Sequence, residues 1–232
     1  MDRKKSILLK RKPLRNHLMD SSSNNIVEID NFITHEECEL LIDYFKRSPR
    51  RFVAEDDFWD NRVVPCGRLS DNKIRRLVES IQYRVAGKIC GYYKEDYIYP
   101  NFSNIVYWGP DMELIPHCDN MHIYHPEREH NTAYRDYSAV LCLNEDYVGG
   151  HTIFPELEVE YTGKTGRLII FPSGRSHLHG VTEVTSGKRY TFALWYTKQR
   201  EKLFYINNVK SLSIWTACAI TSILNICKRL FK

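Results

Sequence analysis

The chain has 232 residues, of which 43% are hydrophobic and 27% are charged, which is the composition of an ordinary globular protein with a sizeable core. Its seven cysteines are irregularly spaced and none forms a CxxC pair. This argues against a disulfide framework and a cysteine-rich zinc site, and it favours a reducing, cytoplasmic compartment.

The formal net charge of +4 is concentrated at the beginning of the chain, where residues 1–16 contain seven of the 33 Lys and Arg residues. Residues 1–24 have no apolar run long enough for a secretory signal, and they end at a polar run of Ser and Asn. We predict that residues 1–24 are a disordered basic arm, and we favour this over a contact with nucleic acid or lipid.

Residues 25–98 are predicted to be an N-terminal helical support region. A short strand is expected at residues 26–29. Residues 34–45 follow helical spacing, and their first residue, a Thr, forms a capping box with Glu37. Apolar residues along 71–89 lie on one stripe of a second helix.

After residue 98 the hydrophobic period changes to that of short strands separated by turn signals such as Gly149-Gly150 and Ser186-Gly187. The expected strands are residues 104–108, 113–118, 137–143, 152–154, 156–161, 167–171, 178–184 and 190–196. Many short strands after two helices predict an α+β protein in which a sandwich, barrel or jelly roll is braced by N-terminal helices.

His117 and Asp119 lie two residues apart at the end of a predicted strand, so their side chains point to one face. One His from a neighbouring strand would complete a triad of two His and one carboxylate. That triad leaves coordination positions open and is typical of non-haem Fe(II) oxygenases. Both His177 and His179 are candidates for the third ligand, and strand alternation does not separate them.

Arg189 follows His179 by ten residues, across the turn predicted at Ser186-Gly187. An antiparallel return would place its guanidinium near His179 but deeper between the strands. A dicarboxylate cosubstrate needs this arrangement, because one end chelates the metal and the other end requires a buried cation. The spacing therefore favours His179 as the third ligand.

These residues lie in segments that resemble the 2-oxoglutarate/Fe(II) oxygenases of the prolyl and lysyl hydroxylase type, and in particular the catalytic domain of leprecan-type prolyl 3-hydroxylases. The resemblance covers about residues 100–198, and its segments are 117–120, 134–141, 143–150, 179–181, 187–189 and 193–197. It implies that residues 99–200 form an Fe(II)/2-oxoglutarate dioxygenase domain with the double-stranded β-helix (jelly roll) fold of the family.

The resemblance also implies site residues. His117, Asp119 and His179 would bind Fe(II), and Arg189 would pair with the remote carboxylate of 2-oxoglutarate. Two further residues are candidate cosubstrate contacts, with core packing as the alternative: they are Tyr107 and Thr191. Ascorbate dependence is implied in the same way.

Other residues near these motifs have plainer interpretations. We expect Trp195 to be a buried core residue, with lining of the iron pocket as the alternative, and His177 to be a packed one. The His residues of the insertion after Asn120 are expected to be lid or surface residues rather than a second metal site, and they are His122, His125 and His130. Trp59 and Arg62 are expected either to reach substrate or to pack at the surface.

The function expected from the resemblance is hydroxylation of an unactivated C–H bond, of a peptidyl proline in the first place, with O₂ as co-reactant. The alternatives are a small-molecule or free amino-acid hydroxylase on the same site, and a catalytically silent β-helix binding module. A nucleic-acid demethylase is disfavoured, because the sequence shows no basic stretch interleaved with aromatic residues for base stacking.

Residues 201–232 are predicted to contain a C-terminal helix. Residues 211–227 are uncharged and flanked by Lys and Arg, but six Ser, Thr and Asn residues dilute their hydrophobicity. A packed or interfacial helix is therefore favoured, and a membrane tail anchor through residues 211–227 is the alternative.

Overall fold

The computed structural model describes residues 24–48, 59, 61–67, 69–204 and 206. The basic arm up to residue 23 and the C-terminal segment from residue 207, which includes 211–227, lie outside the described residues. Within the described residues, no helix combines the length and the apolar character needed to cross a membrane.

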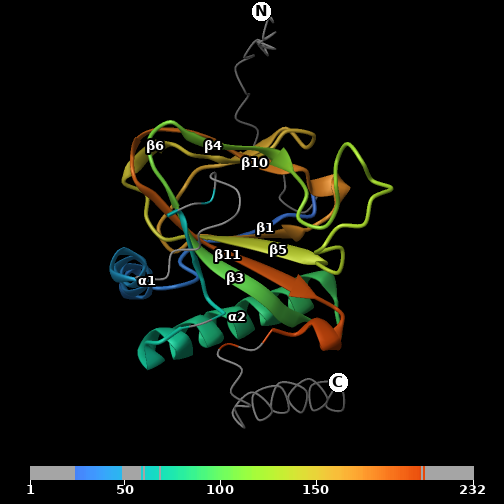
Figure 1. The fold of residues 1–232 in the computed structure, drawn as a ribbon, viewed down its shortest axis with the longest axis horizontal. Coiled ribbons are helices and arrows are strands. Elements are labelled where there is room, and N and C mark those ends of the chain that lie inside the picture. The colour runs from blue at the N-terminus through green and yellow to red at the C-terminus, as the bar shows by residue number, and fades with distance from the viewer. Residues whose placement is uncertain (1–23, 49–58, 60, 68, 205, 207–232) are drawn as a thin grey trace, which may run out of the picture.

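Two antiparallel sheets face each other (Figure 1). The larger sheet has six strands, which in spatial order are β1 (Val27–Ile29), β9 (Leu168–Pro172), β5 (Tyr137–Cys142), β11 (Arg189–Thr197), β3 (Tyr99–Trp108) and β2 (Val63–Pro65). The smaller sheet has five strands, in the order β4 (Met112–His117), β10 (His179–Gly187), β7 (Thr152–Phe154) and β8 (Val159–Tyr161), with β6 (Tyr147–Gly149) also paired to β10. The prediction of an α+β double-stranded β-helix braced by helices is confirmed.

The first helix begins where the sequence predicts. α1 (His35–Arg47) starts after Thr34, whose hydroxyl accepts from the Glu37 backbone N–H while the Glu37 carboxylate accepts from the Thr34 backbone N–H. This reciprocal pairing satisfies two backbone donors at the helix start. The helix ends two residues later than expected, at Arg47, because the basic residues of its last turn extend the helix past the apolar stripe.

The second helix packs under the larger sheet. α2 (Asn72–Tyr93) is capped by Asp71, whose carboxylate accepts from the backbone N–H groups of Lys73 and Ile74. At its other end Lys94 is the C-cap, with φ of 60°. Figure 1 shows α2 along the outer face of the larger sheet. Its stripe is fully buried at Ile74, Val78, Ile81, Val85 and Ile89. Each such side chain contributes about 1.5–3 kcal/mol, so this face accounts for much of the attachment of the helix.

Several strands differ from the predicted ones. β2 and β6 were not expected, because three residues at a sheet edge are too few to show a period. β3 begins at Tyr99 rather than at residue 104, and the strand expected at 156–161 is only β8. The turn at Ser186-Gly187 does join β10 to β11, with Gly187 at φ of 80°.

The apolar core lies on both sides of the larger sheet. The main cluster lies between this sheet and the two helices. A smaller cluster lies between the two sheets, and its members are Val63, Val106, Trp108, Val181 and Val184. The main core therefore lies behind the larger sheet, and part of the space between the sheets is left for a cavity.

Other small elements connect the strands. Two short 3-10 helices are described, η2 (Arg175–His177) before β10 and η3 (Arg200–Lys202) after β11. η2 matters for the site, because it determines where His177 points.

Candidate active site

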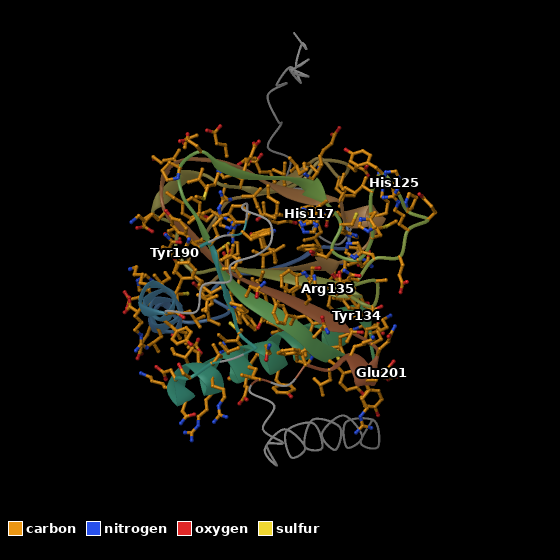
Figure 2. All side chains as sticks on the ribbon, viewed as in Figure 1. His117, His125, Tyr134, Arg135, Tyr190 and Glu201 are labelled. Atoms are coloured by element: carbon orange, nitrogen blue, oxygen red, sulfur yellow. The ribbon has the colours of Figure 1, made fainter. Side chains whose placement is uncertain are left out.

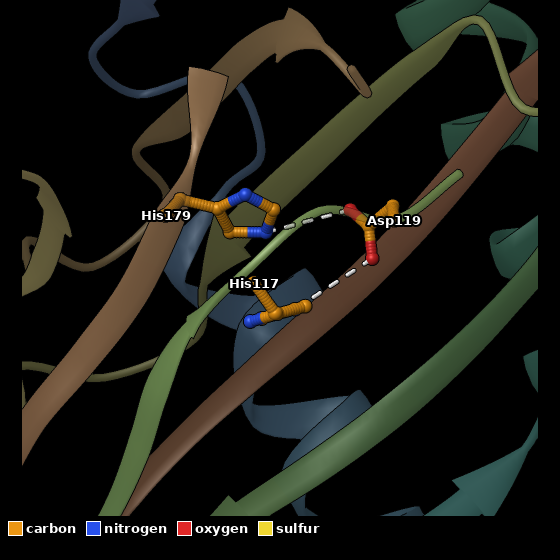
Figure 3. A group of neighbouring side chains, drawn as sticks. All are labelled: His117, Asp119 and His179. Carbon is orange, nitrogen blue, oxygen red and sulfur yellow. Dashed lines mark ion pairs between the residues drawn. The ribbon is translucent and has the colours of Figure 1, made fainter. Parts of the chain in front are cut away.

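The three predicted metal ligands converge. His117 is the last residue of β4 and His179 the first of β10, and the two are paired across the antiparallel ladder. His117 Nε2 lies 3.8 Å from one carboxylate oxygen of Asp119, and His179 Nε2 lies 3.4 Å from the other. Figure 3 shows the three side chains pointing toward one another. Among the described residues, these three form the only group of three or more potential ligands that lie close enough together to bind one metal ion.

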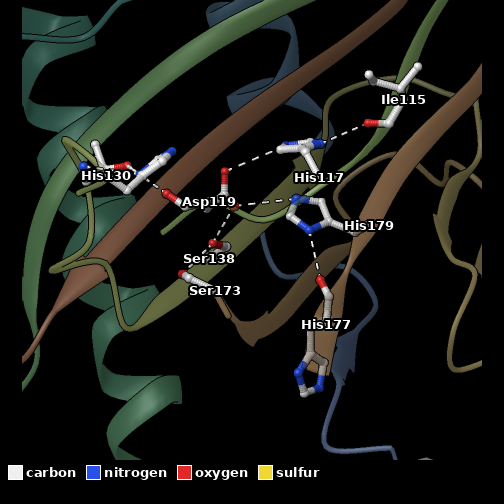
Figure 4. Close-up of polar contacts among 9 residues, drawn as sticks. Ile115, His117, Asp119, His130, Ser138, Ser173, His177 and His179 are labelled. Atoms are coloured by element: carbon white, nitrogen blue, oxygen red, sulfur yellow. Dashed lines mark hydrogen bonds and ion pairs between the residues drawn. The ribbon is translucent and has the colours of Figure 1, made fainter. Parts of the chain in front are cut away.

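His177 is excluded as a ligand by its local structure. It belongs to η2 rather than to the strand, so it does not share the face of His179. Its Nε2 contacts the backbone oxygen of Asn24 at 3.0 Å, and its Nδ1 contacts Ser176 at 2.9 Å. The side chain points away from the triad in Figure 4. It is a packed residue, as predicted.

Each ligand histidine is oriented by a backbone carbonyl. His117 Nδ1 lies 3.2 Å from the Ile115 oxygen, and His179 Nδ1 lies 3.0 Å from the His177 oxygen (Figure 4). A carbonyl can only accept, so in each ring Nδ1 is the donor, and Nε2 is the nitrogen left to bind a metal. Both Nε2 atoms face Asp119, which is the orientation that a metal requires.

The charges of the cluster also suit a metal. Burial opposes the ionisation of Asp119, but His179, His117 and the Ser138 hydroxyl outweigh it and lower its pKa. Burial lowers the pKa of His179 to about 4, against the attraction of Asp119. At neutral pH the site therefore offers an ionised carboxylate and a neutral imidazole, the protonation states that metal ligands need.

The triad lies at one end of a cavity of about 410 Å³ between the two sheets, and Arg189, Thr191 and Thr152 line the other part. Figure 2 shows His117 in the space between the sheets. The His117 side chain is 32% exposed, whereas that of His179 is 8% exposed. The metal position is therefore open on the His117 side and closed on the His179 side.

Arg189 is a buried cation without a partner of opposite charge among the described residues. It is 2% exposed, and its Nη2 donates to the Thr152 hydroxyl at 3.2 Å. Its guanidinium carbon lies 5.7 Å from the centre of the Trp108 ring, and its Nε has no hydrogen-bond partner in the described part of the chain. A buried unpaired charge is costly, so this end of the cavity fits a ligand that carries a carboxylate.

The β3–β11 ladder corrects the prediction for Tyr107. Arg189 is opposite Trp108, Tyr190 is opposite Tyr107, and Thr191 is opposite Val106. Since alternate residues face opposite sides, Trp108 and Thr191 line the cavity while Tyr107 does not. Tyr107 packs on the helix side, with ring centres 5.4 Å from Tyr190 and 6.1 Å from Phe45. We therefore withdraw Tyr107 from the site and keep Thr191.

Two residues at the metal end were misjudged or missed from the sequence. Trp195 lines the cavity instead of being a core residue, and the Arg135 guanidinium lies 4.1 Å from the centre of its ring. Burial lowers the pKa of Arg135, while the nearby Asp119 opposes this. The Arg135 Nε has no hydrogen-bond partner among the described groups. The one signal in the sequence is a basic residue directly before a buried strand, which is weak evidence.

The insertion after Asn120 is partly a wall of the cavity. His130 lines the cavity, and its ring centre lies 4.7 Å from that of His122. Thr132, also in the wall, donates to the Asp119 backbone oxygen at 2.7 Å. His125 is exposed and lies 3.3 Å from Glu127, on the outer loop of Figure 2. The histidines are therefore wall and surface residues, and they do not form a second cluster of three ligands in the described chain.

Of the two residues expected to reach substrate or to pack at the surface, Trp59 reaches the cavity. It lines the cavity and packs edge-on against Trp108, with ring centres 5.9 Å apart. Arg62 does not line it, although its backbone N–H donates to the Trp59 oxygen at 3.2 Å.

Comparison with known proteins agrees with this geometry. Residues 102–197 match the model of the 2OG-Fe(II) oxygenase superfamily. Human prolyl 3-hydroxylase 2 is 46% identical over 69 residues, which are 28% of this chain and 10% of that protein. The matched segment thus spans about a tenth of the length of this curated relative. The expected resemblance to prolyl hydroxylases, including the 3-hydroxylase type, is confirmed.

Solved structures share the fold. A collagen prolyl hydroxylase of Paramecium bursaria Chlorella virus 1 superposes with a TM-score of 0.59 at 17% identity, covering 77% of this chain and 98% of that one. A prolyl hydroxylase of Trichoplax adhaerens, solved with a peptide fragment of hypoxia inducible factor, gives 0.59 at 19% identity over 78% and 87% of the two chains. Residues 102–197 therefore match the 2OG-Fe(II) oxygenase superfamily in sequence, and the chain shares the fold of these prolyl hydroxylases.

Proposed function

We propose that this domain uses Fe(II), 2-oxoglutarate and O₂ to hydroxylate an unactivated C–H bond of a peptidyl proline. The observation that carries the proposal is the pairing of two features in one cavity. A cluster of two histidines and a carboxylate lies at one end, and an unpaired buried guanidinium lies deeper within.

The donor set fits the metal of the family. Two neutral imidazole nitrogens and one carboxylate oxygen are the ligand types of non-haem Fe(II), and they occupy one face only. His117, Asp119 and His179 would hold the ion. When bound, Fe(II) and 2-oxoglutarate supply the activation of O₂, with decarboxylation of the cosubstrate to succinate and insertion of oxygen into the C–H bond.

Arg189 would hold the remote carboxylate of 2-oxoglutarate through charge-assisted hydrogen bonds. Thr191 lies two residues further along β11 on the same face, and Thr152 already accepts from the Arg189 guanidinium. The pairing would neutralise the buried cation, so the free protein and the cosubstrate complex differ most at this residue. Binding and orientation are thus the contribution of this end of the cavity.

The substrate would enter on the open His117 side, where Arg135 and Trp195 form part of the wall. Arg135 lies over the Trp195 ring, so the part of the indole that lines the cavity would offer an apolar contact to a proline ring. The Arg135 guanidinium is a donor for the carbonyl oxygen of the same peptide. We therefore expect proline to sit against Trp195 with its C–H bonds facing the metal.

A second candidate is a free amino-acid or other small-molecule hydroxylase on the same site. It is favoured by one observation, which is that the Arg135 Nε is buried and without a hydrogen-bond partner among the described groups. A free α-carboxylate would fill this role as well as a peptide carbonyl. The third possibility, a silent binding module, is disfavoured because the three ligands and Arg189 are all present and oriented.

The deciding experiment measures succinate release from 2-oxoglutarate with a library of proline-containing peptides, with free proline and with no substrate. The proposal expects Fe(II)-dependent release stimulated by one or more peptides, and a product mass increased by one oxygen atom. Stimulation by free amino acids alone would establish the second candidate. Failure to bind Fe(II) or 2-oxoglutarate under anaerobic conditions would overturn the proposal. By resemblance, we also expect ascorbate to sustain turnover.

Arg135→Ala provides the companion test of substrate binding. It should raise the KM for the peptide by about tenfold, the effect of losing one hydrogen bond to a charged group, and leave the KM for 2-oxoglutarate unchanged. Arg128→Ala, in the preceding insertion and exposed, is the matched control. An equal effect of Arg135→Ala on both substrates would contradict the assignment.

A further inference from the structure

Asp119 is fixed differently from the two histidines. His117 and His179 lie in paired strands, and each ring is oriented by a backbone carbonyl. Asp119 comes two residues after the end of β4, where no strand pairing holds the backbone. Its orientation must therefore come from other contacts.

Thr132 donates to the backbone oxygen of Asp119, and the contacts to its carboxylate and its backbone N–H come from two serines. Ser138 on β5 donates its hydroxyl to Asp119 Oδ2 at 2.6 Å, and its oxygen lies 2.7 Å from the hydroxyl oxygen of Ser173, which follows β9 (Figure 4). The backbone oxygen of Ser173 also accepts from the Asp119 backbone N–H at 3.2 Å. Ser138 is 2% exposed and Ser173 is 0% exposed, so water does not compete for these bonds.

The direction of the hydrogen bonds follows from the charge of Asp119. An ionised carboxylate only accepts, so the single hydroxyl proton of Ser138 is directed to Asp119. The Ser173 hydroxyl must then donate to Ser138. The result is a one-way chain from Ser173 through Ser138 to Asp119, in which each bond polarises the next.

We propose that Ser138 is a positioning residue for the metal, which fixes the rotation of the Asp119 carboxylate, and that Ser173 orients the Ser138 hydroxyl. This inference rests on the metal site of the proposed function, but not on the substrate or on hydroxylation. Partners that orient metal ligands commonly account for about 10–100-fold in metal affinity. The two serines would thus set how tightly the site holds its ion.

The test uses metal binding without turnover. Co(II), which substitutes for Fe(II) and absorbs visible light, is titrated into the metal-free full chain under anaerobic conditions. Ser138→Ala is expected to weaken Co(II) binding by about 10–100-fold and to change the visible spectrum, since the carboxylate is free to rotate. Ser173→Ala should have a smaller effect, because Ser138 can still donate to Asp119.

Two further variants separate positioning from general destabilisation. Ser138→Thr keeps the hydroxyl at a position that lines the cavity, so an affinity closer to wild type than that of Ser138→Ala is expected. Ser103→Ala is the matched control, because Ser103 is also 2% exposed and accepts a hydrogen bond from Gln82 at 3.0 Å, away from the site. It should leave Co(II) affinity unchanged.

The outcomes are distinguishable. Wild-type affinity and an unchanged spectrum for Ser138→Ala would overturn the positioning role while leaving the proposed function intact. An equal loss in Ser138→Ala and Ser103→Ala would also overturn it. If the wild-type chain binds no Co(II) or Fe(II), the proposed function fails and this inference with it. If Ser138→Ala does not fold, the other two variants decide. Unchanged Co(II) binding by Ser173→Ala together with loss of binding by Ser138→Thr would contradict the proposed roles of the two serines.

Discussion

The two ends of the cavity differ in how the protein holds the charged residue that lies there. At the metal end, Ser138 holds the Asp119 carboxylate, and the Nε2 atoms of His117 and His179 face it, so the three groups are in position before a metal binds. At the other end, Arg189 is 2% exposed and no described carboxylate pairs with it. The metal end is therefore preorganised by the protein, whereas the Arg189 end would be completed by the carboxylate ligand that we propose.

The largest effect is expected from breaking the preorganised end. Asp119→Ala should remove turnover and metal binding, because two imidazoles alone do not hold Fe(II) in a facial geometry. Anaerobic Fe(II) titration and succinate release are the two measurements. Asp136→Ala is the control, because Asp136 lies nearby without being part of the triad. Retention of Fe(II) affinity in Asp119→Ala would show that the ion binds elsewhere.

Breaking the other end should affect binding rather than chemistry. Arg189→Ala is expected to weaken 2-oxoglutarate binding by about 2–5 kcal/mol, or about 30-fold to several thousand-fold, because the remote carboxylate loses its buried partner. The measurement is the KM for 2-oxoglutarate, with Fe(II) affinity measured in parallel. Unchanged dependence on 2-oxoglutarate would remove Arg189 from the cosubstrate site.

The free energy of unfolding of the ligand-free protein tests the same difference between the two ends of the cavity. Arg189→Met keeps much of the side-chain volume and removes an unpaired buried charge, so it should raise the free energy of unfolding of the ligand-free protein by about 1–4 kcal/mol. Urea unfolding without cosubstrate is the measurement. With metal present in both proteins, adding 2-oxoglutarate should stabilise the wild type more than the variant. A lower stability of Arg189→Met would mean that the guanidinium is already well paired.

A smaller effect is expected from pH at the metal end. Burial lowers the pKa of His179 to about 4 from its ordinary 6.5. Between these values the unfolded chain binds a proton at this residue that the metal-free folded chain does not, so stability rises with pH across this window. The contribution of His179 to the free energy of unfolding is therefore present above pH 6.5 and is lost as the pH falls toward 4. Urea unfolding of the metal-free protein at several pH values should show this slope, and His179→Gln should show less of it.

The sequence predicted the metal end better than the rest, and the reason is geometric. Two residues spaced by two point to the same side of a strand even when the predicted strand boundary is wrong by a residue. His117 and Asp119 were therefore identified by their local spacing, although Asp119 lies just beyond the end of the strand. The choice of His179 over His177 depended on the turn before Arg189, and the structure adds that η2 removes His177 from the strand face. The missed Arg135 lies where no period exists, because its burial depends on the insertion that precedes it.

The smallest expected effect tests where the sequence argument failed. The position of Tyr107 one strand before the metal ligands suggested a cosubstrate contact, but which of two neighbouring residues faces inward depends on the register of β3 against β11. With Trp108 opposite Arg189, Tyr107 packs on Phe45 and Tyr190 instead. Tyr107→Phe should therefore leave the KM for 2-oxoglutarate within about twofold of wild type, which is the scale of a change outside a site.

Trp108→Phe is the matched variant for that test, because it alters the neighbouring ring that contacts the Arg189 guanidinium. It should raise the KM for 2-oxoglutarate several-fold, since a contact of about 0.5–2 kcal/mol between cation and ring is weakened. The reverse result, a sensitive Tyr107 and an indifferent Trp108, would require the register of β3 to be shifted by one residue. Because such a shift turns every side chain of β3 to the opposite face, it would also move Val106 out of the cavity.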